Sequence, residues 1–201
     1  MKVLNLYAGI GGNRKLWSEK YEVTAVELDS SVASVYSDLF PKDTVIVEDA
    51  HEYLINNFKN FDFIWTSPPC TSHSRLRNGL QNDVIYPDMK LYQEIIILQK
   101  FFKGLFVVEN VIPYYTPLIK PTFQIDRHNF WANFNVPKFS VKSEWRTGKV
   151  ANEKQLLEQK FGYNLDKYKG IDKRKALRNA VIPELGNHIL ESAFTNDLQL
   201  F

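Results

Sequence analysis

The hydrophobic pattern of the first 110 residues alternates short apolar runs with longer stretches of helical period. Such short runs are typical of strands that are buried on both faces of a parallel sheet. The predicted strands cover residues 3–7, 23–27, 44–47, 61–66 and 105–108, and the predicted helices cover residues 13–19, 31–40, 51–58 and 91–102. Repeated units of this kind predict an α/β fold, a doubly wound parallel sheet with right-handed crossovers and helices on both faces.

Beyond residue 110 the periodic signal is weaker. Residues 130–134 resemble one more strand, and the polar stretch that follows contains a helical pattern at 153–161. A closing helix is predicted from Pro183 to Phe194, because proline is favoured in the first turn of a helix. The length of 201 residues and the hydrophobic fraction of 44% indicate one compact domain with a substantial core.

Cysteine usage and the lengths of the apolar runs indicate the compartment. Cys70 is the only cysteine, which excludes an internal disulfide framework and favours a reducing environment. Met1-Lys2 leads directly into a strand-like run rather than into a signal peptide, and no apolar run approaches the ~18 residues of a membrane span. We therefore expect a soluble, cytoplasmic protein that does not bind a membrane.

The positive charge of the chain is concentrated in one segment. Residues 138–178 contain 12 Lys and Arg against 5 Asp and Glu, whereas residues 1–137 contain 13 against 15. A run of like charge is often no more than a solvated face. Beside an active site, however, such a segment favours contact with a polyanion.

Candidate chemistry lies at the carboxyl ends of the predicted strands, where open α/β sheets bind their ligands. Cys70 follows the strand at 61–66 within Ser67-Pro68-Pro69-Cys70. The two prolines force a fixed turn, and positive charge on Arg75 and Arg77 would favour the reactive thiolate. We interpret Cys70 as a candidate nucleophile; the alternative is a small buried hydrophobic residue.

The first strand is followed by a glycine-rich turn, Gly9-Ile10-Gly11-Gly12. Glu27 lies 18 residues after Gly9, close to the ~20 expected for an acid that binds ribose hydroxyls. Asp49 follows the third strand, where it could accept a hydrogen bond from an adenine amino group or cap the next helix. Together these residues favour an adenosine-containing cofactor, although such a turn can also simply connect a strand to a helix.

Two further charged residues belong to the second half of the predicted sheet. Glu109 ends the strand at 105–108, where partial desolvation would let it hold a proton near neutrality. Arg127 precedes the strand at 130–134 and could supply a fixed positive charge to the same pocket. The alternatives are a structural carboxylate paired with a lysine, and a surface ion pair between Arg127 and Asp126.

In this order the motifs resemble those of the cytosine-C5 DNA methyltransferase family, in a short form of phage or bacterial type with a reduced target-recognition region. The resemblance rests on residues 6–12, Glu27, Glu48-Asp49, Ser67-Pro68-Pro69-Cys70, Glu109-Asn110-Val111, Arg127 and Arg178-Asn179-Ala180-Val181. It implies the Rossmann-like sheet of S-adenosylmethionine-dependent methyltransferases with a small irregular target-recognition segment. It also implies S-adenosylmethionine as the cofactor and no metal.

The resemblance assigns roles to individual residues. The implied catalytic residues are Cys70, Glu109 and Arg127. The implied cofactor contacts are Tyr7, Ala8, Gly9, Ile10, Gly11, Gly12, Glu27, Leu28, Asp49, Ala50, Pro69, Asn179 and Ala180. The implied DNA contacts are Ser72, Ser74, Arg75 and Arg77, in a loop from Thr71 to about Tyr86 that would close over a flipped-out base.

In the family's reaction the thiolate adds to carbon 6 of cytosine, which makes carbon 5 nucleophilic enough to take the methyl group. Glu109 would act at N3 and Arg127 at O2 as charge develops there. The resemblance thus implies a DNA (cytosine-5-)-methyltransferase acting on double-stranded DNA. The alternatives are a tRNA cytosine-C5 methyltransferase, and a weakly catalytic nucleic-acid-binding subunit that needs a protein partner to recognise DNA.

Three positions depart from the family pattern, and the chain is short. Thr71 stands where glutamine is common, Asn129 follows Arg127 instead of the second arginine of Arg-x-Arg, and Arg178 replaces a glycine. We predict a cofactor-binding and catalytic core at 1–134, a small basic recognition segment at 135–175 and a C-terminal helix at 176–201 that returns to the core. The expected location is the cytoplasm of a bacterium or of a phage-infected host cell, with restriction-modification among the roles considered.

Overall fold

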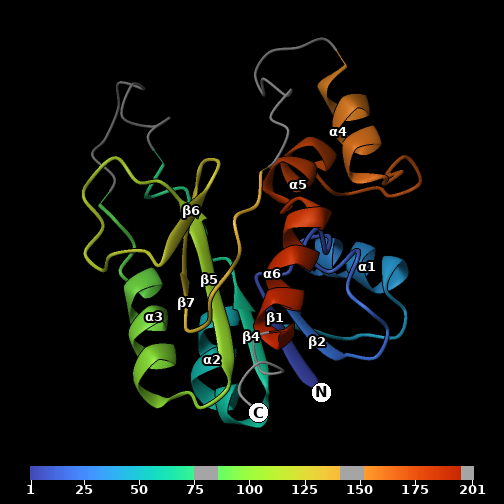
Figure 1. Cartoon of the computed structure of the whole chain (residues 1–201). Coiled ribbons are helices and arrows are strands. Elements are labelled where there is room, and N and C mark those ends of the chain that lie inside the picture. The colour runs from blue at the N-terminus through green and yellow to red at the C-terminus, as the bar shows by residue number, and fades with distance from the viewer. Residues whose placement is uncertain (75–85, 141–151, 196–201) are drawn as a thin grey trace.

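The computed structural model describes residues 1–74, 86–140 and 152–195 (Figure 1). Within these ranges seven strands form one sheet in the order β3-β2-β1-β4-β5-β7-β6. Strands β1 to β5 are parallel to their neighbours, whereas β7 runs antiparallel to β5 and forms a hairpin with β6. The strands are β1 (Lys2–Leu6), β2 (Glu22–Glu27), β3 (Thr44–Val47), β4 (Phe63–Thr66), β5 (Leu105–Val111), β6 (Phe123–Ile125) and β7 (His128–Ala132). The strand order reverses at β1 and β4, which places a ligand crevice outside the carboxyl ends of these two strands.

Helices cover both faces of this sheet, as the predicted doubly wound fold requires. The helices are α1 (Ser30–Leu39), α2 (Ala50–Asn57), α3 (Lys90–Phe101), α4 (Glu153–Phe161), α5 (Lys173–Asn179) and α6 (Pro183–Thr195), with a 3-10 helix η1 at Phe58–Asn60. Side chains alternate between the two faces of a strand, so Leu4 packs in a cluster with α2 and α3 while Val3 packs with α6. Figure 1 shows α6 crossing in front of β1 and β4. None of the helices in the described ranges is long and apolar enough to cross a membrane.

The segment between the hairpin and α6 rests on the first half of the sheet. Leu157 and Phe161 of α4 and Leu177 of α5 form an apolar cluster with Ile10 of the glycine turn and Val35 of α1. Helices α4 and α5 are therefore attached to the half of the sheet that carries the glycine turn, and α5 crosses the predicted boundary between residues 175 and 176.

The structure corrects the helix predicted at residues 13–19, because this stretch forms turns. Two polar side chains in it are drawn inward. The side chains of Asn13 and Asn5 of β1 exchange two hydrogen bonds, of 2.7 and 3.2 Å. Arg14 forms a buried ion pair with Asp43, with Nε 2.8 Å from Oδ2. These tertiary contacts outweigh the modest helical propensity of the stretch.

Two short elements, β6 and α5, were not predicted, because three and seven residues are too few to show a periodic pattern. Strand β7 begins at His128, two residues before the predicted start of that strand. The closing helix predicted from Pro183 is confirmed as α6.

Candidate active site

The glycine turn after β1 has a backbone that only glycine adopts easily at two positions. Gly9 and Gly11 have φ angles of 55° and 76°, in the left-handed region. A Cβ at Gly11 would lie 2.3 Å from the Phe40 ring, and a Cβ at Gly12 would lie 2.4 Å from the carbonyl oxygen of Val181. At Gly9, by contrast, a Cβ would meet nothing within 4 Å. The turn is thus closely packed at Gly11 and Gly12, whereas the space beside Gly9 is open. This open space lets a ligand approach the backbone.

Glu27, at the end of β2, is tied to this turn. One carboxylate oxygen accepts from the amide of Gly9 at 2.9 Å, and the other accepts from the amide of Asp29 at 3.0 Å. The next residue, Leu28, is 67% exposed although it is apolar. A half-buried carboxylate beside an exposed apolar side chain suits a ribose and its attached adenine ring.

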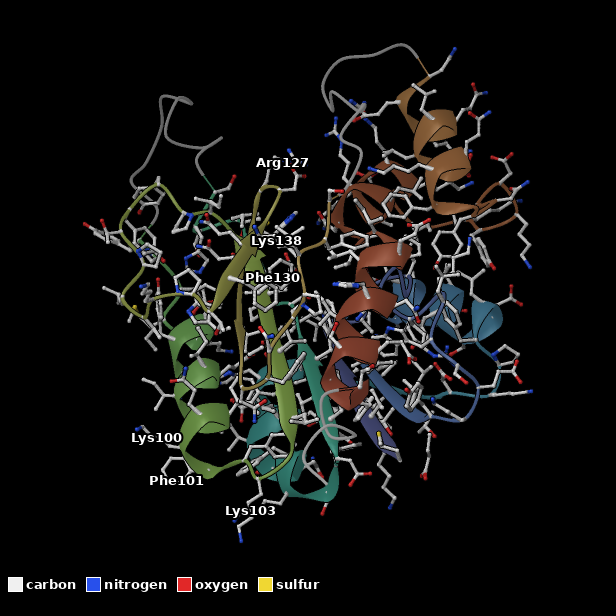
Figure 2. All side chains as sticks on the ribbon, viewed as in Figure 1. Lys100, Phe101, Lys103, Arg127, Phe130 and Lys138 are labelled. Carbon is white, nitrogen blue, oxygen red and sulfur yellow. The ribbon has the colours of Figure 1, made fainter. Side chains whose placement is uncertain are left out.

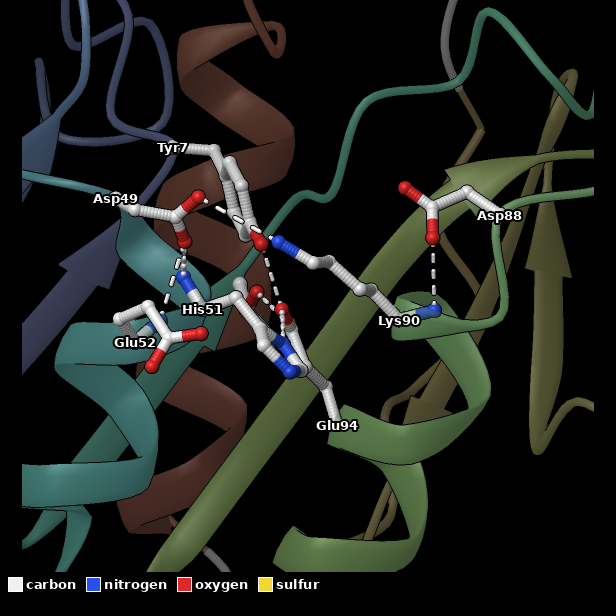
Figure 3. Close-up of polar contacts among 8 residues, drawn as sticks. Tyr7, Asp49, His51, Glu52, Asp88, Lys90 and Glu94 are labelled. Atoms are coloured by element: carbon white, nitrogen blue, oxygen red, sulfur yellow. Dashed lines mark hydrogen bonds and ion pairs between the residues drawn. The ribbon is translucent and has the colours of Figure 1, made fainter.

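Asp49 caps α2, which was the alternative considered for it. Its Oδ1 accepts from the amides of His51 at 2.8 Å and Glu52 at 3.1 Å, and its Oδ2 lies 3.5 Å from Nζ of Lys90 (Figure 3). Burial acts to raise the pKa of Asp49, but the two amides and Lys90 together hold that pKa below its ordinary value. The side chain is partly exposed at the strand end, so capping leaves it accessible to a ligand.

The other predicted cofactor contacts surround the same turn. Ala8, Ile10 and Ala50 are buried in apolar clusters, so a ligand would meet their backbone rather than their side chains. Asn179 ends α5, and Cβ of Ala180 lies against Gly12. The late Asn179-Ala180-Val181 motif is therefore brought to the glycine turn from the far end of the chain. Pro69 is exposed in the turn that follows β4.

A fully buried carboxylate, Glu94 of α3, supports this edge of the sheet and was not predicted (Figure 3). It accepts hydrogen bonds from the hydroxyls of Tyr7 at 2.6 Å and Thr66 at 2.7 Å, and it lies 3.0 Å from Nδ1 of His51. The bond with Glu94 raises the pKa of His51 despite burial, and burial together with Glu94 raises the pKa of Tyr7. Tyr7 has a φ of 54°, so the contact also holds a strained residue in place.

Cys70 is half-buried in the turn after β4. The side-chain Nδ2 of Asn110 in β5 donates a hydrogen bond of 2.8 Å to the backbone carbonyl of Pro68, and this bond fixes the turn to the neighbouring strand. Burial, and then the charge of Glu109, raise the pKa of the Cys70 thiol. Arg75 and Arg77, which were expected to favour the thiolate, lie outside the described residues. Burial and Glu109 both favour the thiol over the thiolate.

Glu109 is 8% exposed in β5, and the described side chain at ion-pair distance from it is His128 of β7 rather than a lysine. Nε2 of His128 lies 3.5 Å from Oε1 of Glu109. Arg127 lies at the tip of the β6–β7 hairpin, with a side chain that is 65% exposed and an Nε 3.8 Å from Asp126 (Figure 2). The surface ion pair considered for Arg127 is therefore present in the structure.

Two of the predicted DNA contacts, Ser72 and Ser74, lie at the start of the loop after Cys70. Oγ of Ser72 accepts from the amide of Asp88 at 3.0 Å, which joins the two ends of the loop just before α3. Ser74 forms an isolated β-bridge with Pro113. Arg75 and Arg77 lie outside the described residues. The base of the loop therefore adjoins both the Cys70 turn and the helix that carries Glu94.

Part of the basic segment is neutralised within the protein. Arg174 and Arg178 of α5 both pair with Glu153, Lys167 pairs with Asp38, and Lys154 pairs with Glu158. The pairs with Glu153 attach α5 to α4, and the pair between Lys167 and Asp38 attaches the loop between these two helices to α1. Several of the charges counted from the sequence thus have structural partners.

An apolar groove lies away from these strand ends. It has a volume of about 740 Å³ and is lined by Ile55, Phe58, Ile97, Phe101 and Phe102, among others. Figure 2 shows Phe101 at the opposite end of the sheet from Arg127. Lys59 and Lys103 are its charged lining residues, and none of the predicted site residues lines it, so it is not the candidate site. Across the described parts of the chain, no group of three or more His, Cys, Asp or Glu side chains is arranged to hold a metal ion.

Comparisons with known proteins identify the family of the chain. Residues 1–130 match the family model described as C-5 cytosine-specific DNA methylase. The chain is 30% identical over 121 residues to the tRNA (cytosine(38)-C(5))-methyltransferase of Mus musculus, an alignment that covers 55% of this chain and 28% of that protein. It is 34% identical over 80 residues to the protein of the same name from Spodoptera frugiperda, covering 37% and 24% of the two chains. The chain therefore spans about a quarter of the length of these relatives.

Among solved structures, a mutant of Spodoptera frugiperda DNMT2 is 32% identical with a TM-score of 0.40, over 55% of this chain and 35% of that one. A methyltransferase from Agrobacterium tumefaciens described as SAM dependent is 18% identical with a TM-score of 0.42, over 58% and 40% of the two chains. The family model covers more than half of the sequence. The chain thus belongs to the C-5 cytosine-specific DNA methylase family, with a Rossmann-like α/β fold and S-adenosylmethionine as its methyl donor.

Proposed function

We propose that this chain methylates carbon 5 of cytosine in double-stranded DNA through a covalent adduct with Cys70. One observation carries the proposal. Cys70 follows β4, and Glu109 lies in the adjacent strand β5, one residue beyond the last β4–β5 pair; the charge of Glu109 acts on the Cys70 thiol, at the same edge as the glycine turn and Glu27. This neighbourhood supports a nucleophile and an acid acting beside a cradle suited to an adenosine-containing methyl donor.

The residues present fit S-adenosylmethionine, which when bound supplies an electrophilic methyl group. The open backbone at Gly9 lets the cofactor approach closely, and Glu27 binds the ribose hydroxyls. Asp49 lies at the adenine end, where Leu28 offers an apolar contact. Asn179 and Ala180 complete the pocket behind Gly12. Each assignment uses a group that the structure places at the carboxyl ends of β1 to β3 or against the turn.

The chemistry requires a nucleophile and stabilisation of the charge that it creates. Cys70 adds to carbon 6 of a flipped-out cytosine, and Glu109 protonates N3 as electron density moves onto that atom. Arg127 contributes a guanidinium at O2 from the turn that begins β7. Ser72, Ser74, Arg75 and Arg77 contact the nucleic acid from the loop that follows the nucleophile.

Double-stranded DNA is favoured as the substrate by the description of the matching family and by the basic segment at 138–178. A tRNA is the second candidate, because the two curated relatives are named tRNA (cytosine(38)-C(5))-methyltransferases. The third reading, a weakly catalytic subunit, requires a protein partner for turnover. The three readings differ in what the isolated chain can methylate.

These three possibilities are separated by an assay in which the chain is given labelled S-adenosylmethionine with duplex DNA or with tRNA. The result is methyl transfer to DNA, to tRNA or to neither. We expect transfer to duplex DNA, and its abolition in Cys70→Ala with cofactor binding almost unchanged, because Cys70 is the only thiol. A tRNA preference would replace DNA as the substrate. Turnover by Cys70→Ala would contradict the covalent mechanism, and activity that appears only after a partner protein is added would support the subunit reading.

A further inference from the structure

The acid at the candidate site is paired with a histidine across two neighbouring strands. In the β5–β7 ladder Glu109 lies opposite Phe130, and His128 lies opposite Val111. Residues directly opposite each other, and residues two apart on one strand, share a face of the sheet. Glu109 and His128 therefore project from the same face, and the 3.5 Å between Oε1 and Nε2 follows from the register of the strands.

The two side chains differ in their access to water. The His128 side chain is 32% exposed, whereas the Glu109 side chain is 11% exposed. A carboxylate that must donate a proton to N3 needs a route by which that proton arrives. Histidine is the side chain that ordinarily gains and loses a proton near neutral pH. The partly exposed His128 side chain thus has more access to solvent than the buried acid beside it.

We propose that His128 is a positioning residue that supplies the proton which Glu109 delivers to N3 of the target cytosine. The inference rests on the proposed function, in which Glu109 is the acid, and adds His128 as the group that protonates it. The imidazolium Nε2–H bond breaks as an O–H bond forms on Glu109. When sulfur bonds to carbon 6, the C5–C6 pair moves to C4–C5 and the C4–N3 pair moves to N3, which takes the proton from Glu109. When C5 takes the methyl group the C4–N3 double bond re-forms, and N3 returns its proton to Glu109. A base from solvent then removes the C5 proton, and the C5–H pair forms the C5–C6 double bond as the C6–S bond breaks.

The same proton transfer assists the nucleophile. The charge of Glu109 contributes to the raised pKa of Cys70, second only to burial. When Glu109 is protonated this repulsion disappears, so the thiolate forms more easily at the moment when the acid is ready to donate. One histidine proton would therefore prepare both groups that act on the cytosine ring.

Few other charges face His128 among the described residues. Asp126 and Arg127 precede it in the same hairpin and pair with each other at 3.8 Å. Lys160 of α4 interacts electrostatically with both of these residues. Glu109 of β5 is the charged group at ion-pair distance from the ring, and Cys70 lies beyond it. Glu109 is thus the acidic group nearest to His128 among those that the structure describes.

The test is the single-turnover rate of methyl transfer between about pH 6 and pH 9 in three variants. In the wild-type protein the rate should fall at high pH as histidine loses its charge. His128→Asn should lower the rate by about 10²-fold at low pH, as loss of a general acid does, and should remove the fall. His128→Arg should not restore the rate, because arginine holds its proton at every pH tested. Cofactor binding and thermal unfolding check that each variant is folded.

His188→Asn is the matched control, because His188 of α6 bonds to the carbonyl of Pro137 at 2.9 Å, away from the site. It should keep the wild-type profile. A wild-type rate and profile in His128→Asn would overturn the inference, and full rescue by arginine would show that a fixed charge suffices, which also overturns the proton transfer. If the wild-type chain methylates no nucleic acid at all, the proposed function fails and the inference fails with it.

Discussion

Two buried carboxylates, Glu94 in α3 and Glu109 in β5, serve the same edge of the sheet in opposite ways. Glu94 is fully buried and has hydrogen bonds of 2.6 to 3.0 Å with Tyr7, Thr66 and His51. Of the described residues, only His128 comes within ion-pair distance of Glu109, at 3.5 Å. A carboxylate whose partners are all in place is costly to disturb, whereas one with few bonds is free to exchange a proton. Burial alone therefore does not distinguish the two carboxylates; the number of their described polar partners does.

The sharpest way to break this comparison is to replace each carboxylate by an amide of the same size. Glu109→Gln should lower methyl transfer by roughly 10²- to 10⁴-fold, the contribution of a general acid, with a change in unfolding free energy below about 1 kcal/mol. The same substitution should increase alkylation of Cys70 by iodoacetamide, because it removes a charge that raises the pKa of the thiol. Single-turnover kinetics and the alkylation rate at fixed pH provide the two measurements.

Glu94→Gln is the control, since it changes the same atoms in the other carboxylate. It should leave the alkylation rate of Cys70 almost unchanged, because Glu94 does not contribute to the pKa of that thiol. Equal effects of the two amides on alkylation would mean that the two carboxylates are not distinguished in the way proposed.

Truncation of Glu94 should have the largest effect on folding. Glu94→Ala leaves the hydroxyls of Tyr7 and Thr66 and the ring of His51 without their shared acceptor, and removal of one partner of a buried charged network costs about 3–5 kcal/mol. Urea denaturation monitored by tryptophan fluorescence measures the loss. Tyr7→Phe removes one of the three bonds and should cost roughly 1 kcal/mol. A loss below about 1 kcal/mol in Glu94→Ala would show that the network is not an anchor.

The sequence predicted which residues lie near the carboxyl edge of the sheet, although β5 continues to Val111 and so contains Glu109. It did not predict the buried polar contacts that support this edge. Gly9, Glu27, Cys70 and Glu109 follow apolar runs, and parallel strands bring such positions to one edge. Glu94 sits inside a predicted helix, and its partners come from β1, β4 and α2, segments that no local pattern joins. A charged residue among inward-facing Leu and Ile positions of a helix was nevertheless a signal.

The second half of the chain was harder to predict for a related reason. His128 begins an antiparallel strand whose start was placed two residues too late, so its register against β5 could not be used. The turns at residues 13–19 are stabilised by Asn5 and Asp43, which are distant in sequence. Local propensity described the scaffold, and long-range polar contacts determined which side chains meet.

A smaller effect is expected on cofactor affinity, at the glycine turn and Glu27. Glu27→Ala should weaken S-adenosylmethionine binding by about 1.5–3 kcal/mol, the range for a hydrogen bond to a charged group. Part of this loss would arise because the carboxylate also accepts from the amide of Gly9 and so holds the turn. Isothermal titration calorimetry measures the affinity, and Glu22→Ala, at the opposite end of β2, is a suitable control. Unchanged affinity would exclude Glu27 from the cofactor site.

The smallest expected effect is the pH dependence that the contact between His51 and Glu94 gives to the free energy of unfolding. Its bond with Glu94 raises the pKa of His51 above the ordinary value of about 6.5. A raised folded-state pKa stabilises the protein fully below the unfolded-state pKa, and this stabilisation disappears as pH rises through the folded-state value. His73 acts in the opposite direction, because burial lowers its pKa. The informative quantity is therefore the difference in unfolding free energy between wild type and His51→Asn. That difference should be larger at pH 6 than at pH 9. A difference that is constant with pH would mean that the contact with Glu94 does not raise the pKa of His51.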